Sequence, residues 1–233
     1  MRRYAIFFIS VPVALVCFRL GFWQLSRLHE RRAHNAEQRA ALAFPPIDLS
    51  NAPASLGAFR AVRGAGRFDY QRQVIVDGAE VRGVPATIVV TPLQLGDGSA
   101  VLVDRGWVPS SNPGAFALEA LKEGDSVIVN GAVMAPGPEP GFAVSADSVW
   151  PKHLQRPTPG SLGALYPYRL RPYIVRRTDA PAAGQRLRLL PLPALTDGPH
   201  LGYVVQWWSF ALIALVGSVF LYRKDREGVR SAG

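Results

Sequence analysis

The hydrophobic pattern is strongest at the two ends of the chain, and polar or β-type stretches lie between them. Residues 203–222 contain no charged side chain. At about 1.5 Å of rise per residue, a helix of this length spans the roughly 30 Å hydrocarbon core of a bilayer. A buried helix of a soluble protein seldom stays uncharged for so long. The pattern predicts a transmembrane helix at 200–222, followed by a cytoplasmic tail at 223–233.

A second apolar segment, 4–23, is interrupted by Pro12 and Arg19. A cleaved signal peptide would also begin with basic residues and an apolar run. However, bulky aromatic residues stand where cleavage would need small ones, so we expect a retained transmembrane helix. The polar residues 24–43 predict that this helix continues beyond the membrane, as far as the prolines of FPPIDLSNAP.

Between the two helices, at 44–199, the periodicity changes to that of β-strands. Short β-branched runs alternate with Gly and Asp turns. This pattern predicts a β-rich α+β extracytoplasmic domain, with a curved antiparallel sheet or barrel. A short helix is expected at 112–122, with Asn112 as its cap and Pro113 in the first position. The strands are expected at 59–68, 73–78, 85–95, 100–108, 126–134, 172–178 and 186–192.

The formal net charge is +9, and the excess lies largely beside the two apolar segments. This distribution favours contact with lipid headgroups and argues against nucleic-acid binding. Arginines precede the first segment and RKDREGVR follows the second, so the positive-inside tendency predicts that both termini are cytoplasmic. Arg27, Arg31 and Arg32 argue the other way, but a long loop crosses a membrane largely regardless of charge.

The usual catalytic signatures are missing from the sequence. It contains no G-x-S-x-G elbow, no H-E-x-x-H and no C-x-x-C-H. The glycines of RGAGRF lack the third glycine of a nucleotide-binding loop, and we interpret them as a turn or bulge. His29, His34 and His153 are expected to be solvated. We therefore expect a protein that is not an enzyme; a membrane-anchored periplasmic enzyme is a distant alternative, without a nucleophile–base pair to support it.

His200 stands at the entrance of the second apolar helix. Pro199 suits the first helical position, with Gly198 or Asp197 as the cap. In that first turn, the positive end of the helix dipole disfavours imidazolium and favours neutral imidazole, the form that binds a metal. This position distinguishes His200 from the other histidines as a candidate ligand.

The neighbours of His200 fit a flat apolar cofactor that carries an iron and carboxylates. Tyr203 and Trp207 lie three and seven residues further on, hence on the same helix face. Residues near the end of the first helix would emerge at the same outer level, where an arginine could pair with a carboxylate. The competing interpretation is an ordinary aromatic belt with a snorkelling arginine and a capping histidine. In the cofactor interpretation, His200 would ligate a haem iron, with Tyr203, Trp207, Arg19, Trp23 and Arg27 around the ring and its carboxylates.

Three motifs resemble those of the Surfeit locus protein 1 family. RLGFWQLSRL (19–28) resembles the L-G-x-W-Q-x-x-R segment that closes the family's first helix. VLVDRGWVP (101–109) is similar to its central V-L-V-N-R-G-W-V-P, with Asp104 where Asn is commoner. GPHLGYVVQWWSFA (198–211) resembles its H-L-x-Y-x-x-x-W motif. The order and spacing of the three motifs cover nearly the whole chain.

This resemblance implies an assembly factor for haem-copper cytochrome c oxidase, which assists delivery or insertion of haem a into subunit I. His200 matches the histidine that the family links to haem a. Subunit I, the haem a synthesis machinery and other assembly factors are the implied partners. The start at Met1, directly before the apolar segment, favours a bacterial plasma-membrane protein. The alternative is a cofactor-free scaffold or chaperone that stabilises an assembly intermediate of the oxidase.

The DRGWVP segment is interpreted as a turn that the domain fold requires, in preference to a partner contact. We expect Asp104 and Arg105 to pair locally, Gly106 to permit a bulge and Trp107 to pack against the sheet.

Overall fold

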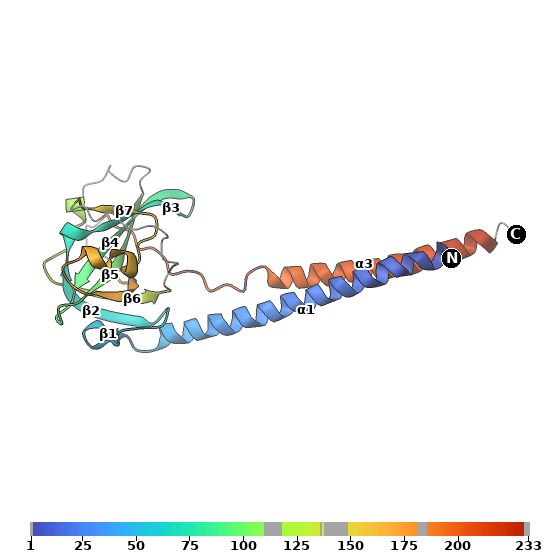
Figure 1. Cartoon of the computed structure of the whole chain (residues 1–233), viewed down its shortest axis with the longest axis horizontal. Coiled ribbons are helices and arrows are strands. Elements are labelled where there is room, and N and C mark those ends of the chain that lie inside the picture. Colours follow the sequence, from blue (N-terminus) through green and yellow to red (C-terminus); the bar gives the residue numbers. More distant parts are fainter. Residues whose placement is uncertain (1, 110–117, 136, 138–148, 181–185, 231–233) are drawn as a thin grey trace. The chain divides into compact units, whose positions relative to one another are not determined.

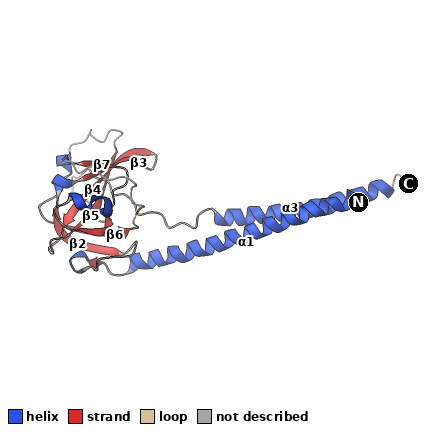
Figure 2. Ribbon diagram, viewed as in Figure 1, coloured by secondary structure: helices blue, strands red, loops and turns tan. Residues whose placement is uncertain are grey.

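The computed structural model describes residues 2–109, 118–135, 137, 149–180 and 186–230. The chain divides into two compact units. One consists of Met1–Glu37 together with Leu195–Gly233, and the other of Gln38–Ala194. The first unit is a pair of long helices and the second is a β-rich domain (Figures 1 and 2). The two apolar helices thus flank the β-rich domain along the sequence, as predicted.

The helix α1 (Arg2–Ala43) is continuous, so the apolar segment and its polar extension form one element, with Pro12 inside it. The second long helix is α3 (His200–Arg230). Both are long and apolar enough to cross a membrane. Most of the exposed large hydrophobic side chains in the described chain lie on these two helices. Such extended apolar surface is typical of helices that face lipid or a protein partner.

Within their unit, α1 and α3 pack in antiparallel directions (Figure 1). Phe7 near the start of α1 contacts Tyr222 near the end of α3, with 5.6 Å between the ring centroids. The middle of the interface is formed by the buried residues Ala14, Cys17 and Ala211. Small side chains let two helix backbones approach closely, which is common between membrane helices.

The β-rich domain is built around a closed barrel of five strands. They pair in the order β2–β6–β8–β5–β4, and β2 pairs back with β4 to close the ring. Three further strands extend this sheet at its edges. The barrel strands are β2 (Ala61–Phe68), β4 (Val84–Gln94), β5 (Ala100–Pro109), β6 (Val127–Met134) and β8 (Leu170–Arg177). The additional strands are β1 (Ile47–Asp48), β3 (Val74–Val81) and β7 (Lys152–Leu154).

Short helical segments connect the strands. Thr158 caps the helix α2 with its side chain, in a reciprocal capping box with Ser161. The segments are η1 (Leu49–Asn51), η2 (Tyr70–Arg72), η4 (Leu118–Leu121), α2 (Pro159–Leu162) and η5 (Gly163–Leu165).

Each expected strand is present except the last. At 186–192 the structure has only an isolated bridge between Arg188 and Trp107. Pro191 and Pro193 lack the N–H groups that a longer ladder would need. The predicted barrel is present. Its sheet is mixed and not purely antiparallel, because β5 and β8 pair in parallel, as do β1 with β2 and β3 with β7.

The helix expected at 112–122 is described only in its last part. Residues 112–117 lie outside the described chain. Within the described residues, Leu118–Leu121 form the short 3-10 helix η4.

Gly64 and Gly66 lie inside β2, so their interpretation as a turn or bulge was wrong. A Cβ at Gly66 would collide with the carbonyl of Gln94, where β2 meets β4. A Cβ at Gly64 would collide with the side chain of Leu49. Glycine is therefore needed for close approach within the barrel, a known role of glycine inside strands.

Candidate functional site

His200 is the first residue of α3. The carbonyl of Pro199 accepts the first hydrogen bond of the helix, from the N–H of Tyr203 at 3.2 Å. Gly198 has a φ of 70°, in the left-handed region that favours glycine. His200 is thus in the first turn, as expected, and the positive φ of Gly198 directs the chain into it.

The segment before α3 is hydrogen-bonded to the polar part of α1. Arg32 Nε donates to Asp197 Oδ2 at 2.8 Å. Asn35 Nδ2 donates to the carbonyl of Thr196 at 2.9 Å, and Arg31 Nε donates to the same carbonyl at 3.3 Å. These contacts hold the turn that precedes the histidine, and they give the Asp197 carboxylate a partner on α1.

The imidazole of His200 contacts Gln24 of α1. Its Nδ1 lies 2.8 Å from Gln24 Oε1. No hydrogen bond to Nε2 occurs within the described part of the chain. A Cβ at Gly198 would lie 3.7 Å from Nε2, so the glycine leaves this edge of the ring without a covering side chain. One ring nitrogen is therefore engaged by α1, and the other is available to a ligand.

Trp208 packs directly over Gly21. The indole Nε1 donates to the carbonyl of Phe18 at 3.4 Å, and the ring lies 5.5 Å from that of Phe22. A Cβ at Gly21 would overlap the indole. The glycine of the RLGFWQ motif is therefore required by the packing of the two helices, which the sequence did not indicate.

Tyr203 and Trp207 follow His200 along α3 at the predicted helical spacing. Tyr203 is exposed. Trp207 packs against the small-residue cluster around Cys17, and it meets Phe210 edge to face at 6.0 Å. An aromatic surface thus continues from His200 along α3.

Arg19 and Trp23 are not brought together with His200. Both are exposed and lie on the outer side of α1. Arg19 precedes Gln24 by five residues, which at 3.6 residues per turn places it roughly 140° away around the helix. Within the described chain Arg19 has no ion pair. The hollow beside it is lined by residues of α1 alone, namely Val16, Arg19, Leu20, Phe22, Trp23 and Ser26.

Arg27 already has a carboxylate partner. Its Nη1 lies 2.6 Å from Glu30 Oε2 in an exposed pair, and its guanidinium lies 6.0 Å from the centre of the Trp23 ring. Exposed pairs of this kind contribute little to stability, so a ligand carboxylate could replace Glu30. In the described chain, no group of three or more side chains is arranged to hold a metal ion, which leaves His200 as a single candidate ligand.

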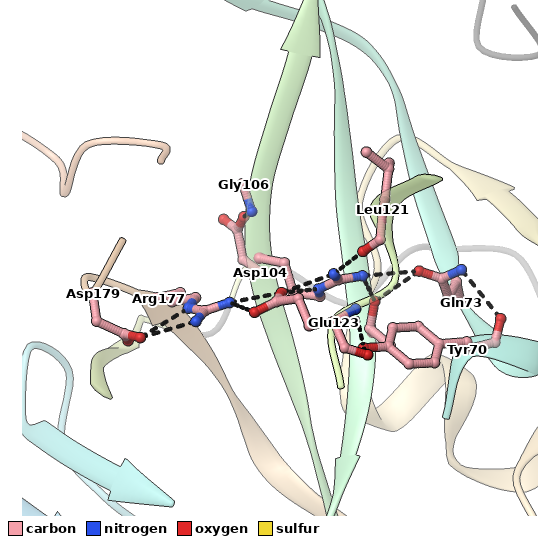
Figure 3. A network of polar contacts seen from close by, with 10 residues as sticks. Tyr70, Gln73, Asp104, Gly106, Leu121, Glu123, Arg177 and Asp179 are labelled. Carbon is pink, nitrogen blue, oxygen red and sulfur yellow. Dashed lines mark hydrogen bonds and ion pairs between the residues drawn. The ribbon is translucent and has the colours of Figure 1, made fainter. Parts of the chain in front are cut away.

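A second polar cluster lies inside the barrel (Figure 3). Arg105 is fully buried and donates to Glu123 Oε1 at 2.8 Å and to the carbonyl of Leu121. Glu123 also accepts two hydrogen bonds from Arg177, at 2.6 and 2.8 Å. Arg177 in turn pairs with Asp179 at 2.9 Å. The cluster ties the segment after η4 to the strands β5 and β8.

The charges in this cluster shift one another's proton affinities. Burial alone would raise the pKa of Glu123, but hydrogen bonds from Arg177 and Arg105 outweigh it and hold that pKa below its ordinary value. Burial lowers the pKa of Arg105 against the opposing pull of Glu123. For Arg177, bonds to Glu123 and Asp179 overcome burial and raise the pKa. Since each charge has a partner, we assign the cluster a structural role.

The DRGWVP segment lies within β5, so its interpretation as a turn was wrong, although two of the expected details hold. Gly106, with a φ of 130°, lies at an irregularity in the pairing of β4 and β5, and Trp107 is buried against Val81. The expected pair of Asp104 and Arg105 was wrong. Neighbouring strand residues point to opposite faces, so Asp104 accepts from Arg176 at 2.8 Å on the other side of the sheet.

His153 is exposed, as expected of a solvated side chain. Its Nδ1 lies 3.2 Å from Asp77 Oδ2, where β7 pairs with β3.

Comparisons with known proteins agree with the three motifs. The SURF1 family matches residues 11–212, a range that contains all three. A SURF1-like protein of Monosiga brevicollis is 28% identical, over 96% of this chain and 90% of that protein. An uncharacterized SURF1-like protein of Mycobacterium tuberculosis is 27% identical, over 95% of this chain and 84% of its own length. A SURF1-like protein of Rickettsia felis is 32% identical over 42% of this chain and 43% of its own. The chain therefore belongs to the SURF1 family.

Proposed function

We propose that this protein takes part in the assembly of haem-copper cytochrome c oxidase by holding haem a for delivery to subunit I. The SURF1 family is known in general for oxidase assembly factors. Haem a would be its cargo. The observation that carries the proposal is the environment of His200, whose Nδ1 is engaged by Gln24 and whose Nε2 is left uncovered.

The residues around His200 fit an axial ligand and one face of an apolar ring. A haem iron accepts an imidazole nitrogen, and His200 offers one at the start of an apolar helix. Tyr203 and Trp207 provide adjoining aromatic surface on the same helix. For the haem carboxylates, Arg27 is the candidate on α1, because Arg19 faces away from this contact. The role of the chain is to bind and orient the cargo.

The haem content of the purified protein tests this function. We expect the wild type to co-purify with haem, and His200→Ala to lose it because the axial nitrogen is removed. His153→Ala is the matched control, since His153 lies in the β-rich domain and pairs with Asp77. Absorption spectra of the detergent-purified variants provide the measurement. Equal haem content in wild type and His200→Ala would remove His200 from the ligand role.

A scaffold without a cofactor is the second candidate. The two arginines that were expected to bind the haem carboxylates favour this scaffold. Arg19 points away from His200, and Arg27 already pairs with Glu30. In that case the protein would stabilise an assembly intermediate of subunit I while another factor supplies the haem. Co-purification of subunit I with a haem-free preparation would support the scaffold.

We also propose that the protein resides in a bacterial plasma membrane. The two candidate spans and their basic flanks support cytoplasmic termini and an extracytoplasmic β-rich domain. His200, at the start of α3, would then lie near the outer surface of the membrane, on the side of the barrel.

A further inference from the structure

We propose that Gln24 is the positioning residue for His200: its side-chain carbonyl keeps the proton of the imidazole on Nδ1 and so leaves Nε2 as the ligating nitrogen. This inference rests on the proposed function as far as haem is concerned. The tautomer itself is a property of the protein alone and can be measured without any ligand.

The contact joins the two helices across a large distance in sequence. Gln24 and His200 are 176 residues apart, yet Gln24 Oε1 and His200 Nδ1 lie 2.8 Å from each other. Gln24 lies on α1 three residues after Gly21, which packs against Trp208 of α3, and four residues before the buried Leu28. Its side chain is therefore directed into the helix interface, where it can reach the first turn of α3.

The chemistry of the two groups decides which ring nitrogen carries the proton. A side-chain carbonyl oxygen can only accept a hydrogen bond, so Nδ1 must donate and carries the hydrogen. In neutral imidazole the other nitrogen, Nε2, then has its lone pair free. Histidines that bind metals commonly donate their second N–H to such an acceptor, which fixes the tautomer and the ring orientation.

Gly198 keeps Nε2 open, and contacts with α1 hold the turn before the ring. Gly198 brings no side chain against it, although a Cβ there would lie only 3.7 Å away. The preceding Thr196 and Asp197 are held on α1 by Asn35 and Arg32, so the backbone before the ring is anchored independently of Gln24. Loss of the Gln24 carbonyl would therefore free the imidazole while the turn itself stays in place.

Three variants separate this role from simple packing. Gln24→Leu keeps a side chain of similar size but removes the oxygen that accepts the hydrogen bond from His200 Nδ1. Gln24→Glu keeps an acceptor oxygen. Gln206→Leu is the matched control, because Gln206 is an exposed glutamine of α3 with no described contact to His200. Nitrogen NMR of the haem-free protein in detergent gives the tautomer, with His200→Ala identifying the signals. Haem titration and the midpoint potential of the bound haem give the second readout.

We expect the wild type, Gln24→Glu and Gln206→Leu to carry the proton on Nδ1, and Gln24→Leu to shift toward Nε2–H. Loss of a partner that orients a metal ligand typically weakens metal affinity by about 10- to 100-fold, and we expect this for Gln24→Leu. The midpoint potential should rise in Gln24→Leu, because a less basic imidazole stabilises ferric iron less. It should fall in Gln24→Glu.

The inference is overturned if the wild-type ring carries its proton on Nε2. It is equally overturned if Gln24→Leu binds haem with wild-type affinity and potential. A different result addresses the proposed function: if the wild type binds no haem, or His200→Ala binds as much, haem handling through His200 fails. The NMR comparison then decides alone whether Gln24 sets the tautomer.

Discussion

At the scale of single residues, Glu123 is the shared carboxylate of a buried ionic cluster in the β-rich domain. Its carboxylate is shared by the guanidinium groups of Arg105 and Arg177, all of them buried. Arg105 also lies 4.8 Å from the centre of the Phe68 ring and 5.2 Å from that of Tyr70. Removing one member of a buried ionic cluster leaves its partners uncompensated, which costs far more than losing an exposed pair.

We therefore predict that Glu123→Gln lowers the free energy of unfolding by about 3–5 kcal/mol, the usual effect of breaking a buried pair. Urea unfolding of the detergent-purified protein, followed by its β-sheet circular dichroism, measures the change. Glu119→Gln is the control, since Glu119 forms an exposed pair with Lys122 and its loss should change stability little. A similar effect of the two substitutions would contradict the structural role of Glu123.

The pH dependence of this contribution has a definite sign. The pKa of Glu123 is lower in the folded protein than its ordinary value of 4.5. A carboxyl group of this kind contributes its stability fully above the unfolded pKa, and the contribution is lost as the pH falls through the folded pKa. The difference in stability between wild type and Glu123→Gln should therefore be largest near neutral pH and shrink below about pH 4.5. A difference that grows on acidification would refute this sign.

At the scale of elements, the packing of α1 against α3 depends on small residues. Gly21 makes room for the indole of Trp208, and Ala14, Cys17 and Ala211 form the buried centre of the interface. A larger side chain at Gly21 must displace the tryptophan or separate the helices. Because His200 meets Gln24 one helical turn further along α1, such a separation would also loosen the candidate site.

The single cysteine allows this packing to be tested. In Ala211→Cys, a short thiol crosslinker should join the introduced cysteine to Cys17, since both positions are buried in one cluster. We predict that adding Gly21→Leu strongly reduces the crosslinking yield. Adding Gly217→Leu is the control, because a Cβ at Gly217 meets no atom within 4 Å. Equal yields in the two double variants would show that Gly21 is not needed for the helix contact.

At the scale of the whole molecule, the β-rich domain is inserted between two helices that can each cross a membrane. If both helices span the membrane, as we propose, both chain ends lie on one side of it and the β-rich domain on the other. The exposed apolar side chains of α1 and α3 would face lipid, whereas the barrel buries its apolar residues in its own core. The basic flanks favour cytoplasmic termini.

Thiol labelling of intact bacteria tests this topology. In a Cys17→Ser background, Asp125→Cys lies on an exposed loop of the barrel domain and Arg226→Cys on the exposed end of α3. We predict that a membrane-impermeant maleimide labels Asp125→Cys in intact cells, and labels Arg226→Cys only after the cells are permeabilised. The opposite pattern would place the barrel in the cytoplasm and the His200 contact at the inner surface.

The local pattern of hydrophobic and polar residues determined where most of the helices and strands of this protein lie. The uncharged run before Arg223 predicted α3, and the short β-branched runs predicted all five barrel strands, because burial of a strand favours such residues in its sequence. The position of His200 in a first helical turn followed from Pro199 and Gly198. Strands as short as β1 and β7 were missed because two or three residues carry no measurable period.

Only the tertiary structure decided which faces meet. The sequence gives the position of Arg19 along α1. Whether that side chain faces α3 depends on the rotation of α1, which the packing of Gly21 against Trp208 sets. The same is true of the Gln24–His200 contact and of the Arg105–Glu123 pair, each of which joins residues far apart in the sequence. Such contacts depend on how segments distant in the sequence pack together, and a local sequence pattern cannot predict that packing.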